Sequence, residues 1–407
     1  MNWGMKRGIF VWLTLLVAMT TMAQKAVVSG TVANKTTGQV VSGASVTAEG
    51  LSVVTNDDGF FMLKCEKQPK KITVTHVGFR PEHIDLDGKL AENMKIHLQP
   101  TTVQLREVIV MADNPRELVQ LAISKIPQNY SQHPELYHCF YRETAMKRQH
   151  YICVAEGVVD MYKTDYEQGI DRDRVAIRKG RRLLSPKLSD TLSVKVLGGP
   201  VAPVQLDIVK NTGLLLNEED LDCYDLKMET PTSIGDRQQY VVSISPRKVL
   251  PYALYNGRLF IDQETLAFTR MELSLDMSNR EKATRVMLIK KPFGVRFKPK
   301  ELSLLVDYRQ GADGVTRISY IRTTFRFNCD WKRRLFSTAF TAFCEMAVTS
   351  TSAQDSQPIR GRESFDQRDA FFDKVDYFRD PTFWQDYNII EPTESLDRAI
   401  HRLLKKY

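Results

Sequence analysis

The chain has 407 residues, of which 57 are Lys or Arg and 49 are Asp or Glu, and its formal net charge at pH 7 is +8. This mild excess is typical of soluble proteins and does not indicate a nucleic-acid partner, while the composition is that of a globular protein without low-complexity segments or a solenoid repeat. The length predicts two or three domains with sizeable cores.

Residues 1–23 have the order of a secretory signal peptide. Two basic residues precede the apolar run 9–19, and small residues up to Ala23 occupy the positions before a cleavage site. This run is shorter than the ~20 apolar residues that span a bilayer, and no later segment approaches that length without charge. We therefore expect export, to the periplasm or the outer-membrane surface, and a mature chain that begins near Gln24 without a transmembrane helix.

Residues 25–100 consist of short alternating runs separated by turn residues, including the hairpin signal at Asp58 and Gly59. The predicted strands cover 26–32, 44–48, 51–55, 60–65, 71–76, 83–86 and 93–98. Seven strands at this spacing predict a small antiparallel sandwich. We expect Val46, Phe60, Ile72 and Val74 in its core.

Four segments in this region resemble, in their order, the carboxypeptidase-regulatory-like domain family. They are VSGTV at 28–32, GASV at 43–46, TNDDGFF at 55–61 and ITVTHVGF at 72–79. The resemblance implies a transthyretin/Ig-like β-sandwich of the kind that often begins envelope proteins and TonB-dependent transporters. The family's domain is non-catalytic, and no His in this chain is followed three residues later by Glu, so zinc-peptidase chemistry is not expected.

Residues 101–135 are predicted to form a linker strand and a helix. Residues 104–112 resemble the strand that follows this domain in transporter-like chains, but the remaining length is too small for a large transporter barrel. Asn114 is the expected N-cap, and Pro127 is expected to end the helix. Its apolar stripe consists of Leu118, Leu121, Ala122 and Ile126.

Residues 136–350 are predicted to form an antiparallel β-rich domain. Its expected strands are 137–146, 151–162, 239–244, 255–262, 266–275, 284–290, 301–308, 316–329 and 335–348, with 239–244 unpaired in the pattern. The hairpin containing GRLFID at 257–262 and RMEL at 270–273 is similar to a repeated unit of the half-barrel lipoprotein-carrier superfamily of the periplasm. That resemblance implies a concave sheet face able to carry an apolar ligand.

Residues 351–407 are predicted to form an aromatic docking segment and a C-terminal helix. Phe383 and Trp384 are expected to dock, because aromatic side chains left in water are a liability. Leu396, Ile400 and Leu403 lie at helical spacing on one face. The predicted fold is thus mainly β, with a seven-stranded transthyretin/Ig-like sandwich followed by an α+β domain of long antiparallel strands and a C-terminal helix.

The six cysteines permit three disulfides in an oxidising compartment, for example between Cys139 and Cys153 or between Cys329 and Cys344 across hairpins. Each cysteine lies in an apolar or strand-like stretch, which favours buried free thiols instead. No spacing of Cys or His predicts a metal site, and no cofactor is expected.

The densest charge run contains basic residues that could form a patch for an anionic glycan or lipid headgroup. They are Arg172, Arg174, Arg178, Lys179, Arg181 and Arg182, with Lys187 beyond them. A solvated strand and loop, partly neutralised by Asp171 and Asp173, explains the same pattern.

No hydrolase elbow, zinc helix or phosphate loop is present in the sequence, so the chain is predicted not to be an enzyme. The main prediction is a binding or scaffold protein of the cell envelope, whose partners would be other envelope proteins, glycans or lipids. The alternatives are a periplasmic carrier of a lipid or other apolar ligand on the half-barrel-like sheet, and an enzyme of unrecognised type. A carrier predicts a large apolar pocket, and a scaffold predicts a shallow or filled sheet face.

Overall fold

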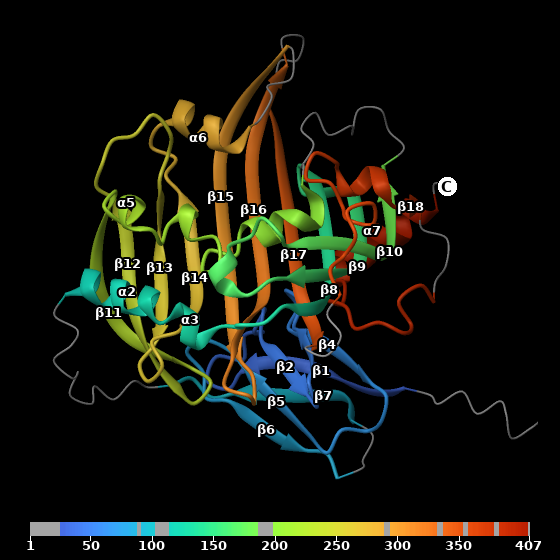
Figure 1. The fold of residues 1–407 in the computed structure, drawn as a ribbon. Helices are drawn as coiled ribbons and strands as arrows, with labels where there is room; N and C mark the ends of the chain where they lie inside the picture. Colours follow the sequence, from blue (N-terminus) through green and yellow to red (C-terminus); the bar gives the residue numbers. More distant parts are fainter. Residues whose placement is uncertain are drawn as a thin grey trace, which may run out of the picture.

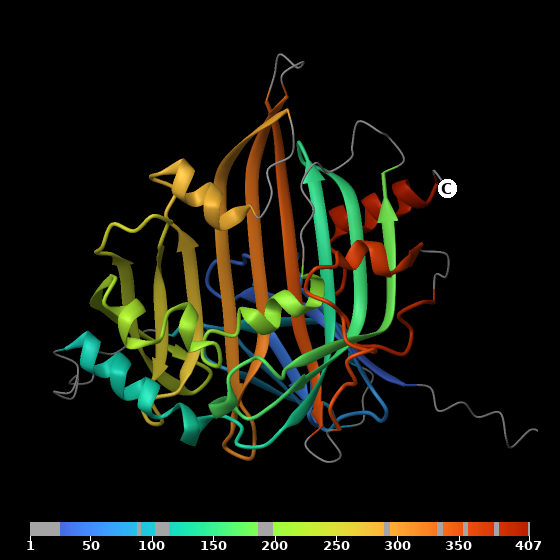
Figure 2. The same cartoon turned by 45° about the horizontal axis from the view of Figure 1, so that its top comes forward.

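The computed structural model describes residues 25–87, 91–101, 114–185, 198–288, 294–331, 337–352, 357–377 and 382–405. A small sandwich at the N-terminal end lies behind and below a large sheet, and short helices cover the sheet's opposite face (Figures 1 and 2). The face with the helices is called the front face below, and the other face the back face. The predicted signal peptide and the predicted strand 104–112 lie outside the described residues.

The N-terminal sandwich has the seven predicted strands. They are β1 Ala26–Asn34, β2 Ser45–Ala48, β3 Leu51–Val54, β4 Phe60–Cys65, β5 Lys71–Thr75, β6 Glu82–Asp85 and β7 Ala91–Leu98. Their order is β4-β1-β7 in one sheet and β3-β2-β5-β6 in the other. The expectation of a purely antiparallel sandwich is wrong, because β7 returns beside β1 and pairs with it in parallel.

The core of the N-terminal sandwich follows the alternation of its strands. Val46, Ile72 and Val74 are fully buried, as predicted. The prediction for Phe60 is wrong by one residue: Phe61 is fully buried, whereas Phe60 is only half-buried. Successive side chains of a strand point to opposite faces, so only one member of this Phe pair can enter the core.

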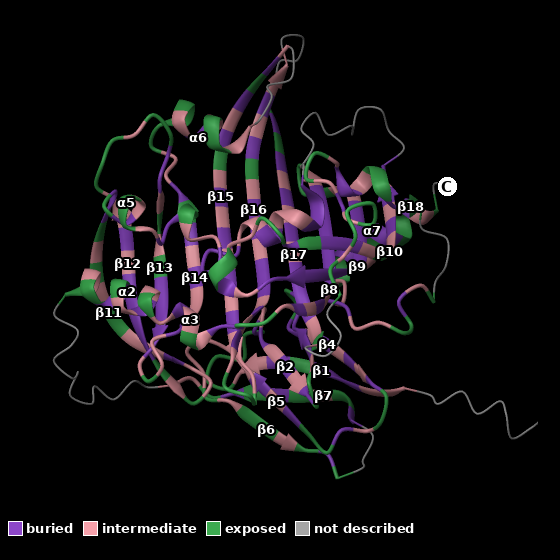
Figure 3. Ribbon diagram, viewed as in Figure 1, coloured by how far each residue is buried: buried purple, intermediate pink, exposed green. Residues whose placement is uncertain are grey.

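The large sheet of the described chain has eleven strands in the order β11-β12-β13-β14-β15-β16-β17-β8-β9-β10-β18. Their bounds are β8 Glu135–Lys147, β9 His150–Lys163, β10 Arg174–Leu184, β11 Tyr224–Ile234, β12 Arg237–Pro246, β13 Tyr255–Asp262, β14 Phe268–Leu275, β15 Val295–Gln310, β16 Thr316–Trp331, β17 Thr338–Ser352 and β18 Asp376–Tyr377. Neighbours are antiparallel except β10 and β18. Burial alternates along β15 and β16, as expected where a strand separates two environments (Figure 3).

Two predicted features of this sheet are wrong. The run 239–244 does not stand alone, because β12 pairs with β11 and β13 on its two sides. The predicted strand 284–290 is replaced by the helix α6 Arg280–Met287, which begins where the Asn279 side chain accepts the N–H groups of Glu281 and Lys282. Local capping and helix-forming residues therefore outweigh the apparent alternation there.

Short helices lie over the front face. They are α2 Pro115–Ser124, α3 Ile126–Asn129, η2 Tyr166–Gln168, η4 Gly199–Val201, α4 Ala202–Gln205, η5 Thr212–Leu214, α5 Glu218–Leu221 and η6 Phe371–Lys374. Asn114 caps α2 as predicted. The helix ends at Ser124 rather than before Pro127. Pro127 instead lies in the first turn of α3, where a backbone N–H would have no partner within the helix.

The C-terminal segment 382–405 packs on the back face. Its helix α7 Glu394–Leu404 buries Leu396, Ile400 and Leu403 against strands β9 and β10. Asn388 exchanges two hydrogen bonds with the backbone of Lys64, at 2.7 and 3.0 Å. This segment therefore joins the N-terminal sandwich to the large sheet.

All six cysteines are free thiols, five of them buried. The hairpin registers explain why the proposed pairs do not form: Cys153 lies opposite Ala145, and Cys329 lies opposite Thr338. The prediction of free thiols is confirmed.

Candidate functional site

The front face of the large sheet is filled by the chain itself. Segments 114–130, 198–223 and 357–377 contribute buried apolar side chains that pack with those of the sheet into one core. The covering side chains include Leu118, Val119, Ala122, Val204, Ile208, Val209, Leu215, Leu216, Phe365 and Phe371. Phe371 lies so close to β9 that a Cβ on Gly157 would come within 2.7 Å of its ring. The expectation of a filled sheet face is met over this core.

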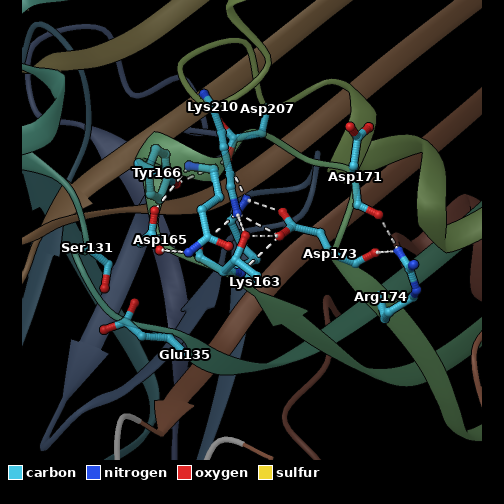
Figure 4. Close-up of polar contacts among 12 residues, drawn as sticks. Ser131, Glu135, Lys163, Asp165, Tyr166, Asp171, Asp173, Arg174, Asp207 and Lys210 are labelled. Carbon is cyan, nitrogen blue, oxygen red and sulfur yellow. Dashed lines mark hydrogen bonds and ion pairs between the residues drawn. The ribbon is translucent and has the colours of Figure 1, made fainter. Parts of the chain in front are cut away.

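A buried ion cluster ties the covering segment 198–223 to the sheet (Figure 4). The Lys163 ammonium donates to Asp207 Oδ2 at 2.5 Å, and Tyr308 and Tyr166 donate to the same carboxylate at 2.8 and 3.0 Å. Lys210 donates to Asp173 Oδ1 at 2.6 Å. Two cations thus face two carboxylates, so the cluster is close to neutral.

The charges of this cluster are set by burial and by their partners. Burial opposes the charge of Lys163, but Asp207 and Asp173 outweigh it and raise its pKa. Burial and the neighbouring Lys163 lower the pKa of Lys210 to about 8, against the pull of Asp173. None of these four residues lines a described cavity. The cluster therefore ties the cover to the sheet by hydrogen bonds and ion pairs between segment 198–223 and residues 163–173.

Glu143 is a second buried acid near this core, and its only described partner is the Tyr141 hydroxyl, which donates to it at 2.6 Å. Burial raises the pKa of Glu143 to about 7 from its ordinary 4.5. The folded state therefore holds this proton more tightly than the unfolded chain. The contribution of Glu143 to the free energy of unfolding is therefore greatest below pH 4.5, the pKa in the unfolded chain. It is lost as the pH rises to about 7, the pKa in the folded protein.

We expect Glu143→Gln to stabilise the protein at about pH 8 by roughly 1 to 3 kcal/mol, with the gain disappearing towards pH 4.5. The amide keeps the acceptor for Tyr141 and removes the buried charge. Chemical denaturation of both proteins across this pH range measures the difference. Glu92→Gln, on an exposed position of β7, is the matched control. A difference that does not vary with pH would contradict the prediction.

The back face carries a second buried network. Glu156 accepts hydrogen bonds from Arg142 at 2.8 Å, from Arg181 at 2.8 Å and from the indole N–H of Trp384 at 3.1 Å. Burial opposes ionisation of Glu156, but the two guanidinium groups outweigh it and lower its pKa. Arg142 also donates to the carbonyl of Ile390 at 2.5 Å. This network therefore holds the C-terminal segment.

The predicted basic patch lies on β10 and the turn before it. Lys179 donates to the Phe383 carbonyl at 2.8 Å, and its ammonium lies 4.1 Å from the centre of that ring. Arg181 lies 4.9 Å from the Trp384 ring centre. Lys179 and Arg181 are thus brought together as a seat for the C-terminal aromatic segment.

The other patch residues have different surroundings. Arg182 donates to the Phe372 carbonyl at 2.5 Å, and Arg178 pairs with Asp160 at 2.5 Å. Arg174 donates to backbone carbonyls in the preceding turn. Arg172 is exposed in that turn, and Lys187 lies outside the described residues. Binding of an anionic ligand by this patch stays a prediction.

Three cavities lined by described residues lie on the back-face side. The largest of these three, about 690 Å³, is called the interdomain groove and lies between β2, β3 and β5 of the N-terminal sandwich and the ends of β15, β16 and β17. A second, of about 570 Å³, is lined by both domains and by residues 386–388. A third, of about 460 Å³, lies on β13 to β16. Charged, polar and apolar side chains together line all three, whereas mainly apolar side chains fill the front face.

Residues 28–110 match the family model of the CarboxypepD_reg-like domain. The N-terminal sandwich is a CarboxypepD_reg-like domain. This confirms the resemblance found in the sequence and assigns one wall of the interdomain groove to that domain. No curated protein matches the chain.

Several solved structures are similar to parts of the chain at low identity. A DUF1329 family protein from Desulfovibrio piger is 9% identical with a TM-score of 0.27, over 60% of this chain and 95% of that chain. A LolA superfamily protein from Nitrosomonas europaea is 12% identical with a TM-score of 0.23, over 60% and 98%. A putative membrane-associated protein of unknown function from Bacteroides fragilis is 9% identical with a TM-score of 0.16, over 81% and 99%. Since these TM-scores are low, the half-barrel resemblance stays a prediction.

Within the described ranges, no group of three or more His, Cys, Asp or Glu side chains could hold a metal ion. No described helix has the length and apolarity needed to cross a membrane.

Sequence reasoning missed the residues that hold the front cover and those that line the grooves. Asp207 and Lys210 stand in an irregular stretch whose neighbours give no periodic signal. Their partners Lys163 and Asp173 are more than thirty residues away. The only signal in the sequence is that Asp207 and Lys210 are charged residues in a mostly apolar run. That signal does not indicate which residues they bind.

Proposed function

We propose that this protein is a non-enzymatic binding or scaffold protein of the cell envelope, exported by its N-terminal signal. The observation that carries the proposal is the filled front face. An apolar cover and a buried ion cluster occupy the surface on which a carrier would hold its ligand. Two of the described cavities instead lie beside the CarboxypepD_reg-like domain, and charged side chains stand among the apolar surface of their linings.

The arrangement of the C-terminal segment supports a scaffold role. Lys64 of the CarboxypepD_reg-like domain donates to the carbonyls of Trp384 and Tyr387 at 2.7 and 3.1 Å. Arg322 of the large sheet pairs with Asp57 at 2.7 Å. Such contacts hold the groove walls in one relative position, and a pre-positioned surface binds a partner at a lower entropic cost.

Native mass spectrometry of the mature protein, expressed in the periplasm, tests the proposal. We expect the mass of the bare polypeptide beginning near Gln24, with no co-purified lipid. An apolar dye that fluoresces on binding should respond weakly to this protein and more strongly to Asp207→Ala, which removes an anchor of the cover. A stoichiometric lipid adduct on the unmutated protein would favour the carrier function instead, and an intact Met1 would contradict export.

A further inference from the structure

Arg309, near the end of β15, reaches from the large sheet to the N-terminal sandwich. Its Nη1 donates to the Ser45 and Ser52 hydroxyls at 3.0 and 2.8 Å. Both partners are neutral, and no carboxylate among the described residues forms an ion pair with Arg309. Two arginines on the next strand differ in this respect, because Arg317 and Arg322 each bind a carboxylate.

The charge of Arg309 is thus uncompensated by the protein. Burial lowers the pKa of Arg309 to about 10, which still leaves the guanidinium charged at neutral pH. A guanidinium has five N–H donors, and the two serines use only those of Nη1. Because Arg309 lines the interdomain groove, its remaining donors are available to a ligand there.

The rest of the groove lining adds to the positive charge. Lys70 and Lys71 are exposed and have no ion-pair partner among the described residues. Glu49 is the opposing acid, and Asp313 is already bound to Arg317 at 2.7 Å. Arg317 also pairs with Glu135 at 2.6 Å, so the groove lining together with Glu135 holds four cations and three carboxylates, an excess of one positive charge. Such a surface attracts anions.

A hydroxyl group adds to the lining on the side of β17. Ser350 and Thr351 both line the groove, but consecutive side chains of a strand point to opposite faces, and only Ser350 lies opposite a back-face residue, His138. A hydroxyl donor in a groove with a guanidinium and two ammonium groups suits the several acceptor oxygens of a phosphate group.

We propose that the interdomain groove binds a phosphate group, with the half-buried Arg309 as its anchor and Lys70 and Lys71 as its exposed ligands. This site rests on the proposed function and defines the chemical class of partner that the protein binds. The planar fork of an arginine fits phosphate oxygens in pairs. A volume of about 690 Å³ exceeds what a phosphate alone needs, so the phosphate belongs to a larger molecule, either a soluble phosphate ester or a lipid headgroup.

Titration of the mature protein with inorganic phosphate, against sodium chloride at equal ionic strength, tests the site. Phosphate should raise the melting temperature of the unmutated protein by mass action. Arg309→Gln should weaken the apparent affinity about 10- to 100-fold, the usual effect of losing a charged hydrogen bond. Lys35→Gln, exposed on the same sandwich and outside the groove, is the matched control and should bind phosphate normally.

Because Arg309→Gln could loosen the packing of the two domains, the double variant Lys70→Gln/Lys71→Gln provides a second test on exposed positions. It should fold normally and weaken phosphate binding several-fold or more. The absence of a phosphate response in the unmutated protein, or an undiminished response in both groove variants, would overturn the site.

Vesicle sedimentation distinguishes the two sources of the phosphate. Binding to phosphatidylglycerol vesicles but not to phosphatidylcholine vesicles, lost in the double variant and kept in Lys35→Gln, supports a lipid headgroup. Phosphate binding without vesicle binding supports a soluble ester. Failure of this site is separable from failure of the proposed function, since bare protein in native mass spectrometry without a phosphate response would count against the site alone.

Discussion

Replacing Trp384 by Ala should lower the melting temperature by roughly 6 to 20 °C, because truncating a large buried aromatic costs about 3 to 5 kcal/mol. The side chain is 6% exposed and packs edge-on against Phe140, with ring centres 5.7 Å apart. Its N–H also donates to Glu156 at 3.1 Å, so the variant loses both packing and a hydrogen bond to a buried charge. Thermal unfolding followed by circular dichroism measures the change.

Two variants control for this prediction. Trp384→Phe keeps an aromatic ring but loses the N–H donor, and it should fall between the unmutated protein and Trp384→Ala. Tyr252→Ala removes an aromatic side chain that is 46% exposed and should change stability by no more than about 0.5 kcal/mol. An unchanged melting curve for Trp384→Ala, with rapid proteolytic loss of residues 382–405 from the unmutated protein, would mean that this segment is not docked in solution.

Replacing Asp207 by Ala should destabilise the protein by about 3 to 5 kcal/mol, since it leaves the charge of Lys163 buried without its closest partner. Asp207 is fully buried, and the hydroxyls of Tyr166 and Tyr308 lose their acceptor with it. Thermal and denaturant unfolding measure the loss. Asp236→Ala, whose side chain is 78% exposed, is the matched control and should be nearly neutral.

A double-mutant cycle tests whether this effect comes from the ion pair. Lys163→Met combined with Asp207→Leu should be less destabilised than the sum of the two single changes, by an interaction free energy of about 0.5 to 3 kcal/mol. Replacing both charges removes the buried unpaired group that each single change creates. Additive losses would show that Asp207 acts through packing and not through Lys163.

The sequence by itself determined the local structure wherever one periodicity or one cap dominated. Alternation over Phe268–Leu275 predicted β14, the Asn114 side chain predicted the start of α2, and the helical spacing of Leu396 and Ile400 predicted the buried face of α7. The order of four segments in residues 25–100 predicted the domain that the family comparison confirms. Where two signals competed, as at 284–290, the cap decided against the alternation.

Only the tertiary structure decided which strands are neighbours and which charges meet. β17 pairs with β8, so Arg142 lies beside Glu345 although 203 residues separate them. Arg181 and Lys179 were visible as charge, but their aromatic partners were not. Arg309 differs from Arg317 only in what the fold places opposite it. Periodicity depends on residues that are close in the sequence. The partner of a buried charge depends instead on which distant segments pack into the same core, and a local sequence pattern contains no information about that packing.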